Sequence, residues 1–471
     1  MVDDDGSSAP RRRPAAAPER ALTILVGLVI VAIVLVVYVA SDLDRRNLYN
    51  HFVWQASAWL GGKTSIAYPV VGGAGAPGND YFNDVQEILA PNGMPTGRGL
   101  LPFPPLPAVV LLPFVAVYGL ATNEQLLAAV LGAVDVGVTF WMLGRLSIGR
   151  GVRAAVTAFF GLGTVLWFAA EEGTTWYFAH VVAVGLLLAA VGIALGGERT
   201  LHLPPRRLAR RRLPFDGRSF IAGMLFGLAC TARLTIVFGA PFFVLVGGGG
   251  WVRRGFSAGV GAALPLAALA AYNVVATGHL FNPVYEYLYH QEAVGYAFLG
   301  YHADWAIEDL RYVPQNLALA LAGPPDVAPV TLDFGQRLCT AAGAVRGWFD
   351  PSCPLIAPKS VGMGLLFTSP AYLLAAPAIL TRRVGRVAGG AALAVVLIGF
   401  VNLMHFSQGW VQFGYRFSLD FAPFALILVA LGLHRLADRA PGRALVLGGG
   451  LIGISMAVNL WGVYWASAYG W

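Results

Sequence analysis

The sequence has little charge and almost no lysine. Only 12% of its 471 residues are Asp, Glu, Lys or Arg, whereas 57% are hydrophobic, and the mean hydropathy is +0.65. Several apolar stretches reach the roughly 20 residues that cross a bilayer. This composition excludes a soluble globular protein and predicts an all-α, polytopic transmembrane helical bundle.

Cysteine is also scarce, and the 3 cysteines and 8 histidines show no spacing typical of a zinc site. Cys230 falls within an apolar stretch, where we expect a small packing residue. Cys339 and Cys353 fall in one loop and would close a short ring if bridged. An oxidising exterior permits that disulfide, and two free thiols are the alternative.

The chain lacks a basic module with interleaved aromatic residues, so its formal charge of +7 does not indicate nucleic-acid binding. The arginines instead cluster between apolar stretches, as is typical of cytoplasmic loops. If six arginine clusters lie on the cytoplasmic side, that side contains 22 of the 32 basic residues but only 7 of the 25 acids. The clusters are the four arginines of the amino-terminal tail, Arg145/Arg150/Arg153, seven arginines from Arg199 to Arg218, Arg253/Arg254, Arg382/Arg383/Arg386 and Arg435/Arg439/Arg443.

These clusters set the topology. Residues 1–20 are polar and Pro-rich and predict a disordered cytoplasmic tail. Residues 21–40 are longer than the core of a signal peptide, which favours a retained signal anchor over cleavage after Ala40. Residues 21–471 then form one membrane domain with the amino end inside and the carboxyl end outside. About eleven spans are expected, at 21–40, 124–144, 154–170, 177–196, 219–232, 234–250, 255–276, 361–381, 388–404, 416–433 and 444–465.

The apolar segment 102–120 is not among these spans. A crossing there would move Arg145, Arg150 and Arg153 to the outside, and prolines at 102, 104, 105 and 107 disfavour a regular helix start. We therefore expect a re-entrant or juxtamembrane helix within a first outer loop of about 41–123.

The pair 219–232 and 234–250 is short for two crossings, with Arg233 at its outer tip. One long tilted helix is the alternative, but it would move the later arginine clusters outside. The pair is therefore favoured, and it leaves a second large outer loop at about 277–360.

Residues 41–60, SDLDRRNLYNHFVWQASAWL, follow the first apolar run directly. Apolar residues at helical spacing opposite a polar face predict an amphipathic helix in the membrane interface. Asp42 and Asp44 stand at its head. Either could cap the helix, or act as a general base whose pKa is raised by partial desolvation.

The same loop contains NDYFND, with Asn79, Asp80, Asn83 and Asp84. On a helix these side chains would lie together and could bind sugar hydroxyls or a divalent cation. In a turn they would be solvated residues only. No other cofactor is indicated.

Glu171 and Glu172 come at the outer end of a predicted span. They are either exposed loop residues or a second wall of a sugar site beside the first outer loop. His180, just inside the next span, is expected to be a packed, hydrogen-bonded residue.

Arg233 and Arg416 lie at the outer ends of apolar runs, away from the cytoplasmic clusters. A cation there costs about 2–3 kcal/mol or more unless it is paired or near the interface. A lipid-linked phosphate would explain them, because arginine offers bidentate donors to phosphate. The alternative is a structural ion pair, for example Arg416 with Asp420 one helical turn later.

The acid after the first span, the segment ending in AWLGGK, the ND pair, GRGLLPFPPLPAVVLLPFVAVYG and GWVQFGYRFSLDFAPF together resemble the GT-C superfamily of polytopic glycosyltransferases. The resemblance covers most of the span layout and is strongest to actinobacterial members. It implies transfer of a sugar, with inversion, from a polyprenyl-phosphate carrier to a glycan, lipid or protein acceptor of the cell envelope. The site would then face outward from the plasma membrane.

The resemblance also implies roles for residues. An acid of the first outer loop serves as base, here Asp44 or Asp42, and basic residues near the membrane bind the carrier phosphate, here Arg416 and Arg233. The DLD sequence departs from the acidic motif of better known members, so the choice between its two aspartates stays open. The segment YNVVATGHLFNPVYEY would present Asn282, Tyr285 and Glu286 near the acceptor.

A transporter or flippase of a lipid-linked substrate is the alternative function. Continuous spans, few charges at mid-span (Asp135 is the clearest) and the absence of evident inverted repeats disfavour it.

Overall fold

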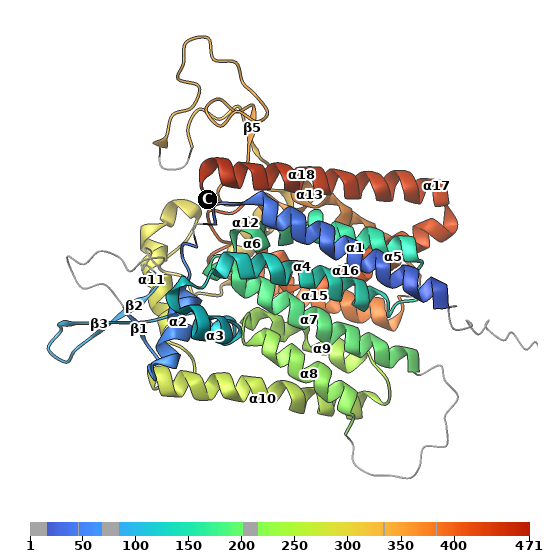
Figure 1. Cartoon of the computed structure of the whole chain (residues 1–471), viewed down its shortest axis with the longest axis horizontal. Helices are drawn as coiled ribbons and strands as arrows, with labels where there is room; N and C mark the ends of the chain where they lie inside the picture. Colours follow the sequence, from blue (N-terminus) through green and yellow to red (C-terminus); the bar gives the residue numbers. More distant parts are fainter. Residues whose placement is uncertain (1–16, 46, 68–83, 201–214, 333–334, 383) are drawn as a thin grey trace, which may run out of the picture.

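The structure is a computed structural model that describes residues 17–45, 47–67, 84–200, 215–332, 335–382 and 384–471. Its long helices lie side by side along one direction (Figure 1), which confirms the predicted all-α membrane bundle. The bundle consists of α1 (Ala17–Ser41), α4 (Glu124–Leu143), α5 (Arg150–Leu162), α6 (Leu166–Glu172), α7 (Thr175–Thr200), α8 (Gly217–Cys230), η2 (Leu234–Gly239), α9 (Ala240–Leu245), α10 (Trp251–Thr277), α13 (Leu365–Thr368), η6 (Pro370–Ala375), α14 (Ala376–Ile379), α15 (Arg386–Met404), η7 (Arg416–Asp420), α16 (Ala422–Arg439), α17 (Pro441–Arg443), η8 (Ala444–Gly448) and α18 (Gly449–Tyr469).

Helices occupy all eleven predicted spans, but they differ in length. Among the described residues, six are long and apolar enough to cross a membrane, or seven if the pair α5 and α6, bent by 44°, is one span. The pair α8 and η2–α9 is confirmed as two helices, and the 14 residues of α8 extend only about 21 Å. The segment 361–381 is broken at its prolines into α13, η6 and α14.

The two predicted outer loops meet at one end of the bundle (Figure 1). Helix α1 begins at the opposite end, and the carboxyl terminus lies near the loops. The amide of Asn282 donates hydrogen bonds to the carbonyls of Leu101 and Pro102 and so ties the second loop to the first. We call this end the outer end, in line with the predicted topology.

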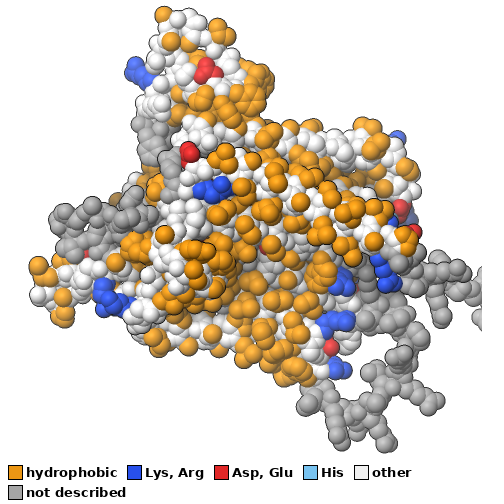
Figure 2. Space-filling model, viewed as in Figure 1, with side chains coloured by type: hydrophobic (Ala, Val, Ile, Leu, Met, Phe, Trp, Pro, Cys, Tyr) orange, Lys and Arg blue, Asp and Glu red, His pale blue; other side chains and the backbone are white. Residues whose placement is uncertain are grey.

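The surface of the bundle is largely apolar. Figure 2 shows hydrophobic side chains over most of the visible helices, with several Lys and Arg side chains at the end away from the outer loops. At that end Arg254 donates to the carbonyls of Val244 and Gly247, and Arg386 pairs with Glu198. The basic residues therefore gather on one side, as the positive-inside pattern requires.

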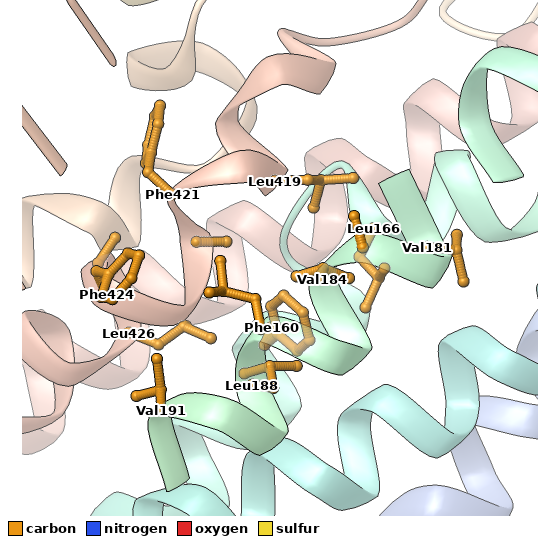
Figure 3. Packing of buried hydrophobic residues seen from close by; sticks show 14 of the residues in the cluster. Phe160, Leu166, Val181, Val184, Leu188, Val191, Leu419, Phe421, Phe424 and Leu426 are labelled. Atoms are coloured by element: carbon orange, nitrogen blue, oxygen red, sulfur yellow. The ribbon is translucent and has the colours of Figure 1, made fainter. Parts of the chain in front are cut away.

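The core of the bundle surrounds α16, in which every residue from Ala422 to Ala430 is buried. Side chains of α5, α6 and α7 pack against α16 and η7 (Figure 3). Burial of a large apolar side chain contributes roughly 1.5–3 kcal/mol. This packing holds η7, which carries Arg416, firmly at the outer end of the core.

The first outer loop differs from prediction at residues 41–60. The helix α2 spans only His51–Leu60, and its N-cap is Asn50 rather than an aspartate. Residues 42–45 and 47–50 are irregular, and Arg45, Asn47 and Tyr49 have positive φ. The single amphipathic helix over 41–60 was therefore wrong, and α2 is buried on the supposedly polar side as well, since Trp54 is 8% exposed.

A small antiparallel sheet, which the sequence did not predict, follows α2 in the first loop. It has the order β1 (Ile66–Ala67), β3 (Pro95–Leu100), β2 (Gln86–Leu89), with Ile66 opposite Gly99 and Glu87 also opposite Gly99. The chain then enters the juxtamembrane helix α3 (Leu106–Tyr118) and η1 (Gly119–Ala121). The expected short helix at 102–120 is thus present.

The second outer loop is built from short elements: α11 (Val284–Gly295), η3 (Ala297–Leu299), η4 (Leu310–Tyr312), α12 (Val313–Ala322), β4 (Asp326–Val327) and β5 (Ile356–Ala357). Strands β4 and β5 pair antiparallel. Cys339 and Cys353 form the predicted disulfide, and Cys230 is buried in α8 as expected.

Candidate functional site

Arg416 lies at the outer end of the core, at the first residue of η7. Its guanidinium carbon is 5.3 Å from the Tyr177 ring centroid, and its Nε is buried without a hydrogen-bond partner. Within the described ranges no carboxylate forms an ion pair with it. The alternative pairing of Arg416 with Asp420 is therefore absent. The guanidinium interacts with the hydroxyl of Tyr177, while its Nε is available to an anion.

Asp84 is 4% exposed, and the charge of Arg416 acts on its carboxylate. One carboxylate oxygen, Oδ2, accepts a hydrogen bond of 2.8 Å from Trp176 Nε1. Burial raises the pKa of Asp84 to about 6, although the Trp176 hydrogen bond and the Arg416 charge act to lower it. Asp84 lies in a turn before β2 and is buried rather than solvated. Asn79, Asp80 and Asn83 are outside the described residues, so the Asn/Asp cluster stays a prediction.

Glu292 of α11 completes this group. Its side chain is half-buried, and burial followed by the Asp84 charge raises its pKa to about 8, while Arg416 lowers it. Glu292 was missed in the sequence. Its spacing of seven residues from Tyr285 places both on one face of α11, and this signal could have found it. We refer to Asp84, Glu292 and Arg416 as the Arg416 cluster.

Tyr285 links the Arg416 cluster to a second group of polar side chains, His405 and Glu308. Its hydroxyl lies 3.0 Å from His405 Nε2, and His405 Nδ1 is 3.4 Å from the carboxylate of Glu308. Burial raises the pKa of Tyr285 above its usual value, while the Arg233 charge lowers it. Tyr285 therefore lies between the Arg416 cluster and a His–carboxylate pair.

Arg233 is placed differently from Arg416. Its Nε and Nη2 donate to the two oxygens of Asp420 at 3.3 and 3.2 Å. The same buried carboxylate lies 3.0 Å from His180 Nδ1 and accepts hydrogen bonds from Thr235 and Asn402. The structural ion pair considered for these arginines thus occurs at Arg233, with Asp420 as partner, and His180 is packed and hydrogen-bonded as expected.

Asp42 and Asp44 also differ from each other. Asp42 Oδ1 accepts the backbone N–H groups of Asp44 and Arg45, and Oδ2 accepts a 2.6 Å hydrogen bond from Gln125. The residue Asp44 is exposed. Asp42 therefore caps a turn before α2 and does not cap the helix itself, so the predicted helix N-cap was wrong for both aspartates.

Glu171 and Glu172 end helix α6, where they are 3% and 8% exposed. They are not exposed loop residues. The Glu171 carbonyl accepts from Gln125, the residue that also holds Asp42. Both glutamates and Arg416 lie within electrostatic range of Tyr177, so they border the Arg416 cluster on the side of α6.

Asn282 and Glu286 lie away from the cluster. The side-chain amide of Asn282 donates hydrogen bonds to backbone carbonyls of the first loop. The Glu286 side chain is 70% exposed and 4.0 Å from His290. Of the predicted acceptor-binding residues on this segment, only Tyr285 points toward the charged groups.

The predicted divalent cation site finds no support in the described part of the chain. No group of three or more His, Cys, Asp and Glu side chains there could hold a metal ion. Asp84 and Glu292 supply two carboxylates, and the third neighbour is a guanidinium. This donor set suits an anion beside two acids rather than a metal.

No protein-family model and no curated protein matches the chain. Its structure is similar to those of an oligosaccharyltransferase from Archaeoglobus fulgidus (TM-score 0.49, 12% identity) and of ArnT from Cupriavidus metallidurans bound to undecaprenyl phosphate (TM-score 0.43, 16% identity). Each comparison covers 96% of this chain, which spans 57% of the length of the archaeal enzyme and 76% of ArnT. Both are GT-C membrane glycosyltransferases, the superfamily that the sequence resembles. All three TM-scores are below 0.5, including 0.44 for ArnT in the apo state.

Proposed function

We propose that this protein is a membrane glycosyltransferase. It moves a sugar from a polyprenyl-phosphate carrier to a glycan, lipid or protein acceptor on the outer face of the plasma membrane. One observation carries the proposal: at the outer end of a membrane bundle, the buried Nε of Arg416 has no hydrogen-bond partner, and the Arg416 charge acts on two carboxylates, Asp84 and Glu292, whose pKa values burial raises.

The guanidinium of Arg416 suits the carrier phosphate. Arginine binds phosphate through two parallel hydrogen bonds, and the charge stabilises the phosphate as it leaves. Arg233 is already neutralised by Asp420, so it contributes to the site by holding η7 in place. A lipid-linked phosphate reaches this depth because its chain remains in the bilayer.

Asp84 suits the role of general base. A base works best when its pKa lies near the operating pH, and the pKa of Asp84 is about 6. In an inverting displacement the acceptor oxygen bonds to the anomeric carbon as the bond from that carbon to the phosphate oxygen breaks. The acceptor proton passes to Asp84, and Arg416 takes up the negative charge of the phosphate.

Glu292 complements Asp84 because its pKa of about 8 keeps it protonated at neutral pH. Two neighbouring acids with separated pKa values divide the roles of base and proton donor. The protonated Glu292 donates a hydrogen bond to the sugar. Asp42 and Asp44, the bases expected from the resemblance, are the alternatives that mutagenesis compares. A divalent cation has no step in this mechanism.

The test uses the purified full-length protein in lipid nanodiscs with a panel of radiolabelled polyprenyl-phosphate sugars and envelope extract as acceptor. We expect transfer by the wild type and a loss of about 10²–10⁴-fold in Asp84→Asn, the usual contribution of a general base. Asp44→Asn is the matched control, since that carboxylate is exposed. Full activity of Asp84→Asn together with loss in Asp44→Asn or Asp42→Asn would move the base to the latter residues. An absence of transfer with every donor, while the protein moves the carrier across the bilayer, would favour a flippase.

A further inference from the structure

A lobe of the second outer loop projects sideways from the bundle. It comprises residues 326–332 and 335–357 of the described chain, which leaves and rejoins the bundle at the β4–β5 pair, where Asp326 lies opposite Ala357. The Cys339–Cys353 disulfide closes the lobe. Figure 1 shows it standing off beyond α18, near the outer end.

The lobe exposes apolar side chains that an aqueous loop would bury. Val345 is 84% exposed, Trp348 is 58% exposed and Phe349 is 59% exposed. These residues belong to the stretch 341–349, AAGAVRGWF, in which the alanines are exposed as well. A contiguous apolar patch of this kind marks a surface that binds a partner or a membrane.

The charged side chains in and next to this stretch, Arg346 and Asp350, form hydrogen bonds within the lobe. Arg346 Nη1 donates to the carbonyls of Pro329 and Pro354 at 2.9 and 2.8 Å. Asp350 accepts hydrogen bonds from the backbone and hydroxyl of Ser352. The outward face of 341–349 is therefore left apolar, although Arg337 is exposed on the other arm of the lobe.

The contacts between the lobe and α18 indicate what covers the apolar face of residues 341–349. The hydroxyl of Tyr464 donates to the Phe349 carbonyl at 2.6 Å, and the two rings pack edge to face with centroids 5.1 Å apart. Tyr464 belongs to the candidate span Pro441–Tyr469 and stands five residues, or about 8 Å, before its end. That end is rich in aromatic residues, with Trp461, Trp465, Tyr469 and Trp471 close by.

Aromatic side chains gather where a span leaves the hydrocarbon core. We propose that residues 341–349 insert into the headgroup region of the outer leaflet, so that the disulfide-closed lobe is a membrane anchor. The proposal depends on α18 crossing the bilayer and not on the glycosyltransferase activity. The anchor also bears on the site, because residues after β5 pair with the segment before Arg416: Gln412 N donates to Ser360 O, and Met363 N donates to Phe413 O.

The test attaches an environment-sensitive NBD fluorophore to single cysteines at Val345 and Trp348, in a Cys230→Ser background that keeps the Cys339–Cys353 bridge. Asn92→Cys, in the exposed turn between β2 and β3, is the matched control. In nanodiscs of phosphatidylcholine and phosphatidylglycerol with doxyl-labelled lipid, we expect blue-shifted emission and at least about twofold more quenching at Val345 and Trp348 than at Asn92.

Two results would overturn the proposal. Probes at Val345 and Trp348 that are quenched by aqueous iodide, and by doxyl lipid no more than Asn92, would show that the lobe lies in water. Probes shielded from both quenchers, with copies that cross-link through Val345→Cys, would show that a second chain covers the face.

Discussion

The outer end of the bundle contains two arginines that break the cytoplasmic pattern, and their surroundings differ. Arg233 is held by a buried carboxylate, Asp420, that has four polar neighbours. The charge of Arg416 acts on two carboxylates whose pKa values burial raises, and its Nε has no hydrogen-bond partner. The difference separates a cation that stabilises the fold from one that remains available for a ligand.

Removing the carboxylate that pairs with Arg233 should have the largest effect on the stability of the protein. Asp420→Ala leaves Arg233, whose side chain is 24% exposed, without its carboxylate. Breaking a fully buried pair costs about 3–5 kcal/mol, so we expect a loss near the lower end of that range. Thermal unfolding in detergent measures the loss. Arg416→Gln is the matched control and should change stability little. Equal losses in both variants would refute the distinction between the two arginines.

Asp84→Asn should stabilise the protein while it removes activity. In the folded protein, burial raises the pKa of Asp84 from 3.8 to about 6. The ionised carboxylate therefore destabilises the native state, with a cost that grows as pH rises from about 4 to 6 and then stays constant. Two pKa units correspond to about 3 kcal/mol. The gain in unfolding free energy should be full at pH 8 and absent at pH 4. A gain independent of pH would contradict the assigned pKa.

Arg416→Gln should weaken carrier binding rather than the fold. Loss of charge-assisted hydrogen bonds to phosphate costs about 1.5–3 kcal/mol, which is roughly a 10–100-fold weaker affinity. Binding of polyprenyl phosphate in nanodiscs, followed by intrinsic fluorescence, measures it. Thr235→Val, next to Asp420 rather than Arg416, is the control and should bind as the wild type does. Unchanged binding in Arg416→Gln would show that the carrier phosphate does not bind at Arg416.

The apolar runs were enough to predict the bundle and the paired short helices around Arg233, and the arginine clusters were enough to predict that the two large loops share one end of it. Local reasoning failed where distant segments decide the structure. Residues 41–60 were predicted as one helix, but Asn47 bonds to the Thr122 carbonyl and to the Glu124 backbone, which requires a positive φ there. The sequence contains no local sign of these partners.

In the site, too, local spacing did not predict the contacts that distant segments make. Spacing suggested a pair between Arg416 and Asp420, yet η7 is a 3-10 helix, and Asp420 turns to Arg233, 187 residues away in sequence. Glu292 depends on how α11 packs against the first loop, so its proximity to Asp84 could not be predicted from either segment alone. Asp84 was named from the sequence as a residue of an outer site, whereas Glu292 and the grouping of the two acids were not.

The smallest effect is expected at Glu292, and it sharpens the role of the Arg416 cluster. Burial and the Asp84 charge raise the pKa of Glu292 to about 8, so it is protonated at pH 7 and loses its proton as pH rises through 8. Glu292→Gln preserves a neutral donor and should keep activity within about threefold at pH 7, because the hydrogen bond is retained.

The decisive readout is the pH profile of transfer. In the wild type the rate should rise as Asp84 ionises near pH 6 and fall as Glu292 ionises near pH 8. Glu292→Gln should abolish the fall and leave the rise, whereas Glu292→Ala should lower the rate throughout. A fall that persists in Glu292→Gln would mean that another group controls the alkaline limb, and that Arg416 meets its ligand with Asp84 alone.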